Sequence, residues 1–281
     1  MRKIKGFTLV ELSIVIVIIG FLVAAITSGA SMIKQAEMRS VINDLQSFRT
    51  AYNNFIAAYG AVPGDMVVAS SYWPNGACAQ TDSNCNGNGN GLIEATTTNA
   101  EPDEVRGALK QLALAGMINA GIPQIPDAII QLVPGVNAPA SKLSDAGYYY
   151  ASSAYDTQVY QLPLDPGVNY IFLGGYSPVS GAHPLLNFLY TGALTPMDAF
   201  SIDYKMDDGI ILSYNDNLFD ALLSNVMAAN PAHVVSNFGG GTTGKIRGCD
   251  AYSYGYGGCV YQGTYDVVEN FKICGLAYAL N

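Results

Sequence analysis

Residues 6–33 read GFTLVELSIVIVIIGFLVAAITSGASMI, and no charged residue occurs from Leu12 to Ile33. This apolar run is long enough to cross the hydrocarbon core of a membrane as an α-helix, which needs about 20 residues. Its many β-branched residues would favour a strand in water, but an unbroken run of this length without alternation is typical of a membrane helix. Basic residues precede the run and an acidic chain follows it, so the positive-inside rule predicts that the C-terminal part lies outside the cytoplasm.

Glu11 is the one charged residue at the edge of this apolar stretch. A carboxylate in a membrane costs about 2.5 kcal/mol or more at the bilayer centre, and less near an interface. No Lys or Arg follows it until Lys34, which is out of helical reach. We therefore expect the partner of Glu11 to come from the chain's own N-terminus or from another subunit.

Residues 6–12 (GFTLVEL), after a short basic leader and before an apolar helix, resemble the prepilin leader of type IV pilins and type II secretion pseudopilins. The resemblance implies cleavage between Gly6 and Phe7 by prepilin peptidase, and methylation of the new Phe7 amine. It also implies that Glu11, at the fifth mature position, pairs with the Phe7 amine during assembly. An ordinary signal peptide ending near residues 24–30, or a plain anchor, would leave Glu11 and the Gly-Phe junction unexplained.

From Lys34 to Tyr59 apolar residues recur at steps of three and four, which predicts an amphipathic helix that Gly60 and Pro63 end. A continuous helix from Phe7 to Tyr59 would be on the order of 80 Å long, and its second half needs a head to pack against. The resemblance implies an α+β, pilin-like fold, with this helix on an antiparallel β-sheet head that carries large loop insertions. The expected parts are a leader (1–6), a transmembrane and filament-core helix (7–33), its amphipathic continuation (34–60) and a globular extracytoplasmic head (61–281).

Within the head, local patterns predict a few further elements. A short helix is expected over 104–115, and residues 195–198 (TPMD) form a capping box that opens a helix to about Met206. Strands are expected at 148–151, 169–175, 210–214 and 271–278. The Asn-, Gly- and Thr-rich residues 74–100 are expected to form a loop, and residues 121–147 show only weak periodicity.

Composition argues against several classes of function. The 281 residues carry a net charge of −9, and half of them are hydrophobic, so the chain is neither disordered nor expected to bind nucleic acid. No nucleophile elbow and no phosphate-binding loop occurs in the sequence, and the two histidines, His183 and His233, are isolated. We therefore expect no enzyme activity.

The resemblance implies a structural subunit of a type IV pilus or a type II secretion pseudopilus. The implied partners are other pilin subunits, prepilin peptidase and an inner-membrane assembly platform. The precursor would cross the inner membrane once, and the assembled subunit would lie in a cell-surface pilus or a periplasmic pseudopilus. The alternative is a minor or tip pilin that acts as an adhesin or as a primer of assembly.

Five cysteines in an extracytoplasmic head predict two disulfides and one remaining thiol. Cys78 and Cys85 flank a short loop and are expected to pair locally. For the second bridge we favour Cys259–Cys274, since C-terminal loops are tied in this way in many pilins, and Cys249–Cys274 is the close alternative. Fully reduced cysteines and bridges between subunits also remain open.

Residues 86–94 (NGNGNGLIE) resemble the start of an EF-hand-type calcium loop. Asn86, Asn88, Asn90 and Glu94 are the predicted calcium ligands, with Ile93 as the apolar anchor. The pattern departs from that loop because Asn replaces the first Asp and Thr97 replaces the twelfth-position Glu. The alternative is an Asn-Gly turn loop without metal. A second group of acidic residues is a weaker candidate for a calcium site, because the capping box already accounts for Asp198. The group comprises Asp198, Asp203, Asp207 and Asp208.

Overall fold

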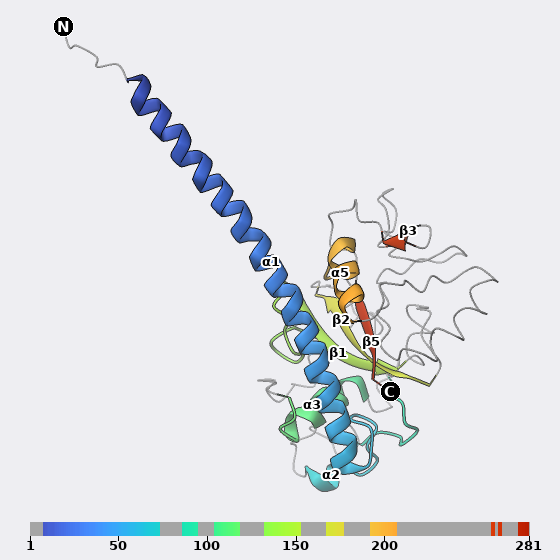
Figure 1. Cartoon of the computed structure of the whole chain (residues 1–281). Helices are drawn as coiled ribbons and strands as arrows, with labels where there is room; N and C mark the ends of the chain where they lie inside the picture. Colours follow the sequence, from blue (N-terminus) through green and yellow to red (C-terminus); the bar gives the residue numbers. More distant parts are fainter. Residues whose placement is uncertain are drawn as a thin grey trace, which may run out of the picture.

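The computed structural model describes residues 8–73, 86–94, 104–118, 132–152, 167–176, 192–206, 260–261, 264–265 and 275–280. One long helix, α1 (Leu9–Tyr59), projects from the head over about half of its length (Figure 1). Its N-terminal half makes no contact with the rest of the described chain, whereas its C-terminal half lies along the head.

The ends of α1 are set by local chemistry. Thr8 is the N-cap residue, with extended backbone and a side chain that accepts a hydrogen bond from the Glu11 N–H. At the other end Gly60 adopts a left-handed conformation (φ 68°) and its N–H donates to the Ile56 carbonyl at 2.8 Å. The helix predicted from Phe7 to Tyr59 is thus confirmed over 51 residues, and Phe7 itself lies outside the described residues.

The head contains the helices α2 (Ala69–Tyr72), α3 (Glu104–Leu114) and α5 (Pro196–Met206). Its main sheet has the order β1-β2-β5, with both pairs antiparallel. The strands are β1 (Ala146–Ser152), β2 (Asn169–Gly175) and β5 (Leu276–Ala279), and a separate small pair is formed by β3 (Val260–Tyr261) and β4 (Thr264–Tyr265). This long helix with a small antiparallel sheet confirms the α+β, pilin-like fold class.

The predicted elements of the head agree closely with these bounds where the structure describes them. The strand at 169–175 and the two helices at 104 and 196 are confirmed within one residue. The strand expected at 148–151 begins two residues earlier, because the small residues Ala146 and Gly147 pair with Gly175 and Gly174. The expected strand at 271–278 is observed over Leu276–Ala279, while residues 271–274 and the strand expected at 210–214 lie outside the described residues.

The core forms where the C-terminal half of α1 crosses the sheet. All residues of β1, β2 and β5 are buried, and the residues of α1 that face them are buried as well (Met38, Val41, Leu45, Ala51, Tyr52 and Phe55). Aromatic rings fill the contact: the ring of Phe48 lies 5.0 Å from that of Tyr148, and Tyr52 stacks on Tyr150 at 6.2 Å. This packing fixes the head onto one half of α1.

Candidate functional site

The N-terminal end of α1 is closed by a reciprocal capping box. The Thr8 N–H and hydroxyl both donate to Glu11 Oε2, at 2.8 and 2.9 Å, and the Glu11 N–H donates back to Thr8 Oγ1 at 3.2 Å. The sequence already contained this signal, because Thr8 and Glu11 have the T-x-x-E spacing, but the sequence analysis did not use it. The expected partner of Glu11, the Phe7 amine, lies outside the described residues together with Gly6.

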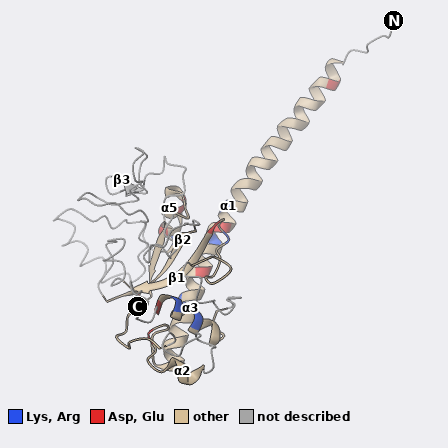
Figure 2. Cartoon of the chain, turned by 180° about the vertical axis from the view of Figure 1, so that it is seen from behind, with Lys and Arg blue, Asp and Glu red and all other residues tan. Residues whose placement is uncertain are grey.

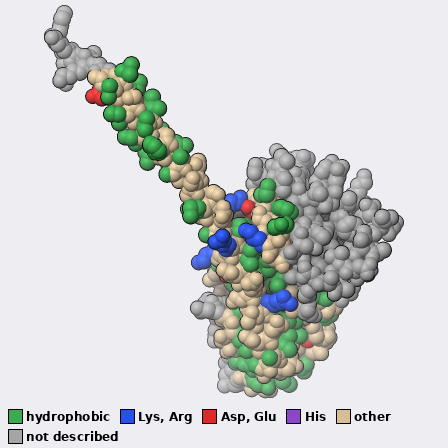
Figure 3. Space-filling model, viewed as in Figure 1, with side chains coloured by type: hydrophobic (Ala, Val, Ile, Leu, Met, Phe, Trp, Pro, Cys, Tyr) green, Lys and Arg blue, Asp and Glu red, His purple; other side chains and the backbone are tan. Residues whose placement is uncertain are grey.

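The N-terminal half of α1 presents apolar side chains in every direction. Its large hydrophobic residues from Leu9 to Ile33 are all exposed, and Glu11 is the only charged residue among them (Figure 2). The space-filling view shows hydrophobic side chains gathered on the part of the projecting rod nearer its free end (Figure 3). Exposed apolar surface of this extent marks a contact with lipid or with other chains. By length and composition α1 can cross a membrane.

The C-terminal half of α1 also makes polar contacts with the sheet. Arg49 Nη1 donates to the Tyr278 hydroxyl at 2.9 Å, and the Tyr148 hydroxyl donates to Asp44 Oδ2 at 3.1 Å. Burial raises the pKa of the Asp44 carboxyl, although the hydrogen bond from Tyr148 opposes this rise. These contacts orient the head around the helix axis.

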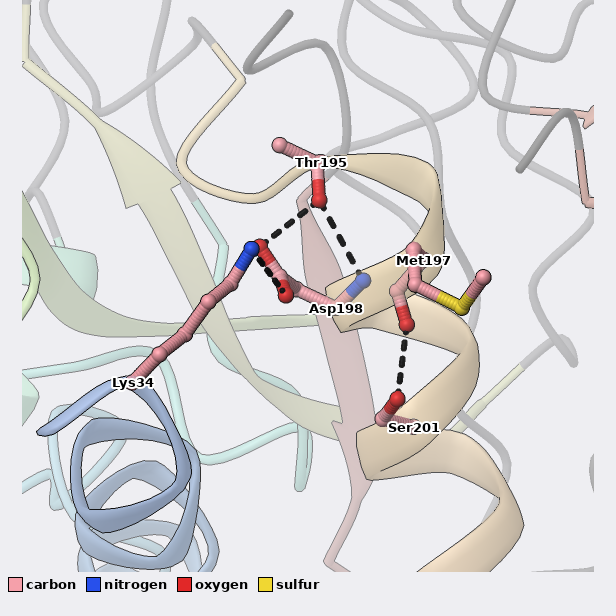
Figure 4. A network of polar contacts seen from close by, with 5 residues as sticks. All are labelled: Lys34, Thr195, Met197, Asp198 and Ser201. Atoms are coloured by element: carbon pink, nitrogen blue, oxygen red, sulfur yellow. Dashed lines mark hydrogen bonds and ion pairs between the residues drawn. The ribbon is translucent and has the colours of Figure 1, made fainter. Parts of the chain in front are cut away.

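An ion pair ties α5 to α1 at the point where the apolar run ends. Lys34 Nζ lies 2.9 Å from Asp198 Oδ1, and the Thr195 hydroxyl donates to Asp198 Oδ2 at 2.7 Å (Figure 4). The Asp198 N–H donates in turn to Thr195 Oγ1 at 3.3 Å, which is the N-cap half of the predicted capping box, while the Asp198 carboxylate accepts the Thr195 hydroxyl. Both carboxylate oxygens of Asp198 therefore have partners within the chain. Asp203 lies buried on the same helix, and Asp207 and Asp208 lie outside the described residues.

The predicted calcium loop folds around two carboxylates that the sequence analysis did not assign to it. Asp65 Oδ1 accepts the N–H groups of Gly89 and Asn90, and Asp65 Oδ2 accepts that of Gly91 at 2.6 Å. The two segments lie so close that a Cβ on Gly87 would stand 2.3 Å from the Asp65 Cα, so only glycine fits there. Asp65 itself is 3% exposed.

Glu104, the first residue of α3, holds the other side of this loop. Its Oε1 accepts the Asn88 N–H and its Oε2 accepts the Glu94 N–H, both at 2.9 Å. Glu104 is 2% exposed, and this burial raises its pKa from the ordinary 4.5 to about 7; the two N–H donors oppose the rise, while the neighbouring carboxylates of Asp65 and Glu94 add to it. The loop is therefore held by a carboxyl group of α3 whose pKa burial raises to about 7.

The structure brings three of the four predicted calcium ligands together. The side-chain amides of Asn88 and Asn90 donate to Glu94 Oε2 at 3.0 and 2.7 Å. Asn86 points elsewhere, because its Oδ1 accepts the Ser70 N–H at 2.8 Å. The anchor Ile93 is fully buried, and its carbonyl accepts the Ser152 N–H at the end of β1. Among the described residues no group of three His, Cys, Asp or Glu is arranged to hold a metal ion, and calcium binding stays a prediction.

The predicted disulfides involve residues outside the described ranges. All five cysteines (Cys78, Cys85, Cys249, Cys259 and Cys274) lie outside the described residues. Their pairing stays a prediction.

Residues 1–27 match the family model described as the prokaryotic N-terminal methylation motif, which is the signature of type IV pilins and pseudopilins. The motif covers the leader, the Gly6–Phe7 junction, Glu11 and most of the exposed half of α1. It indicates a membrane-anchored precursor that prepilin peptidase processes, and it favours a structural subunit. No curated protein and no solved structure matches the chain.

Proposed function

We propose that this protein is a structural subunit of a type IV pilus or of a type II secretion pseudopilus. The observation that carries the proposal is that the two halves of α1 differ in the burial of their side chains. The half inside the methylation motif exposes apolar side chains all round, and the other half is packed into a folded head. Such a rod can be inserted in a membrane and then bundled with identical rods, because both surroundings cover its apolar surface.

In this proposal the leader (1–6) is removed after Gly6, and the Phe7 amine is methylated. Residues 7–33 then cross the inner membrane, residues 34–60 continue the helix, and the head (61–281) lies outside the cytoplasm. The assembly platform transfers the subunit into the filament, where the heads of the subunits face outward. The final location is the cell surface for a pilus and the periplasm for a pseudopilus.

Glu11 is the proposed assembly residue. Its carboxylate is held by Thr8 in the single chain, and in the filament it pairs with a Phe7 amine, which places an incoming subunit in register. A charge in the apolar filament core is tolerated only when it is paired. Glu11→Ala should therefore keep membrane insertion and cleavage but lose filaments. Thr8→Val is the matched control, since it removes the hydroxyl of the cap and keeps the carboxylate. Normal filaments from Glu11→Ala would contradict the role.

Isolation of filaments separates the main proposal from the alternative of a minor or tip pilin. A major subunit dominates the preparation, and immunogold label should cover the filament along its length. A minor adhesin or primer would be rare or confined to one end. The disulfides are tested on the same material by non-reducing peptide mapping, where a link from Cys78 to the C-terminal cysteines would contradict the proposed layout.

Calcium is proposed for the loop of residues 86–94. The support is the cluster of Asn88, Asn90 and Glu94, in which the two amides now occupy Glu94 Oε2. Calcium would replace these donors, and binding to the folded state would raise the melting temperature. Isothermal titration of the full chain in detergent should give heat that is lost in Glu94→Gln. No heat and no melting shift at millimolar calcium would leave the loop as the metal-free alternative.

A further inference from the structure

The helix α5 has large apolar side chains on the face that it exposes. Its buried face includes Asp198, Ala199, Ile202 and Asp203, as expected for a helix packed on a core. The opposite face carries Met197 (46% exposed), Phe200 (37%) and Tyr204 (66%) at helical spacings of three and four. A helix in contact with water alone would carry polar residues there, so this face indicates a contact with another apolar surface.

The position of this face in the fold identifies the surface. Asp198, in the first turn of α5, contacts Lys34, the first charged residue after the apolar run of α1. Figure 4 shows the Met197 side chain directed away from Lys34, outward from the contact between the two helices. The exposed face of α5 thus begins at the level where α1 would leave the hydrocarbon core of the membrane, because Lys34 directly follows the apolar run.

We propose that the exposed face of α5 (Met197, Phe200 and Tyr204) rests in the headgroup region of the membrane while the subunit awaits assembly. This inference rests on the proposed membrane-anchored precursor. Its chemistry fits the position, because tyrosine and other amphipathic aromatic residues are enriched at the membrane interface. The exposed side chain of Lys205, beside Tyr204, adds a cation that anionic headgroups attract.

The ion pair between Lys34 and Asp198 gives this contact a mechanical role. Because Lys34 and Asp198 lie 2.9 Å apart and the head is packed on α1, contact of this face with the membrane would hold the head in one orientation relative to the bilayer. The apolar surface of α5 is then released when the subunit leaves the bilayer. A second copy of the chain is the competing occupant, and the experiment distinguishes it.

Tryptophan fluorescence in vesicles tests the contact. The chain has one tryptophan, Trp73, which lies at the far end of α1 with its ring 5.3 Å from that of Tyr59. Trp73→Phe supplies a background without tryptophan, and Met197→Trp in this background places the probe on α5. The full chain is reconstituted into phosphatidylethanolamine and phosphatidylglycerol vesicles whose acyl chains carry bromine near the headgroup. The probe at position 197 should lose most of its emission.

Tyr72→Trp in the same background is the matched control, because Tyr72 is 54% exposed on α2. It lies on the order of 40 Å along α1 from Lys34, since Tyr59 is its neighbour, so its emission should be unchanged by bromine. Equal quenching of both probes, or none at position 197, would overturn the proposal. A blue shift in the emission of the position-197 probe that occurs only in filaments would also overturn the proposal. It would show that a second copy of the chain, and not lipid, covers this face. If Met197→Trp does not fold, Tyr204→Trp replaces it.

The failure of this inference differs from a failure of the proposed function. A chain that does not float with the vesicles would contradict the membrane-anchored precursor. A chain that floats without quenching at position 197 or 204 would contradict only the contact of α5 with lipid.

Discussion

Asp65 accepts three consecutive backbone N–H groups from a segment that has no helix or strand of its own. A loop of this kind must find partners for its N–H groups outside a regular ladder, because an unpaired buried N–H is costly. An ionised carboxylate is the strongest acceptor that a side chain can offer. The conformation of residues 89–91 therefore depends on one carboxylate located 24 to 26 positions earlier in the chain.

Asp65→Asn should destabilise the head. The amide keeps one acceptor oxygen but places an NH2 group where the second oxygen accepted an N–H, so at least one donor loses its partner. The expected cost is about 1–3 kcal/mol, which corresponds to a fall of several degrees in melting temperature. Differential scanning fluorimetry of the full chain in detergent measures it. Asp145→Asn, at an exposed turn residue with φ 56°, is the control and should change nothing. Equal melting temperatures of both variants and the natural chain would contradict the role of Asp65 in holding the loop.

Glu104 should make the head less stable as the pH rises towards neutrality. Its pKa is 4.5 in an ordinary setting and about 7 in the folded chain, so between these values the folded state keeps a proton that the unfolded state loses. Stability from this group therefore falls as the pH rises through this window, and its full cost is present above about pH 7. Below the unfolded pKa both states hold the proton, so the stability from this group is fully present there and no longer changes with pH.

Glu104→Gln tests this pH dependence. The variant has no titrating group at position 104. From about pH 5 to about pH 8 its melting temperature should therefore rise relative to that of the natural chain. Glu37→Gln, at a partly exposed position of α1, is the control. A difference that stays constant with pH would show that the pKa of Glu104 is not raised in the folded chain.

At the scale of the element, α1 joins two environments in one helix. Its helical backbone is continuous, so what differs between the halves is the surroundings of the side chains. Leu45 is fully buried against the head, whereas Leu22 is exposed in the apolar half. The stability of the head should therefore depend on one half and not on the other.

Leu45→Ala should cost about 2–5 kcal/mol, because it leaves a cavity in a packed core. Leu22→Ala removes the same atoms and should leave the melting temperature of the head unchanged in detergent. The pair forms a matched comparison, since residue type and helix are the same. Similar losses for both variants would mean that the N-terminal half also packs on the head.

Sequence patterns predicted the elements better than the contacts between them. The 22-residue apolar run and the three-and-four spacing over 34–59 are local signals, and they gave α1 to within two residues. The capping box at Thr195 gave the start of α5 for the same reason. The carboxylates at Asp65 and Glu104 were not predicted as partners of residues 88–94, because nothing local shows which loop folds back on which turn. The pairing of Lys34 with Asp198 was missed for that same reason.

At the scale of the whole molecule, the apolar rod and the head are two parts with different requirements. The rod gains free energy when any apolar surrounding covers it, at about 25 cal/mol per Å2 of buried apolar surface. The membrane and a bundle of rods both meet that requirement, so transfer from one to the other needs no refolding of the head. In the proposed filament, the site that would give the bundle its register is the N-terminal turn, where Thr8 and Glu11 are joined.

Processing is the prediction that tests the whole molecule at once. In a host with prepilin peptidase the mature chain should begin at Phe7 and carry a methyl group on its amine. Removal of Arg2, Lys3 and Lys5 leaves 10 basic residues against 22 acidic ones, so the net charge changes from −9 to −12. Mass spectrometry of the intact chain measures the N-terminus, and isoelectric focusing measures the change in charge. Gly6→Val is the control, because a branched side chain at the junction should block the cut and keep the charge at −9. A natural chain that starts at Met1, or near Ala30, would contradict the prepilin assignment, since only cleavage at the Gly6–Phe7 junction leaves α1 with its full apolar half and with Glu11 one turn from a free amine.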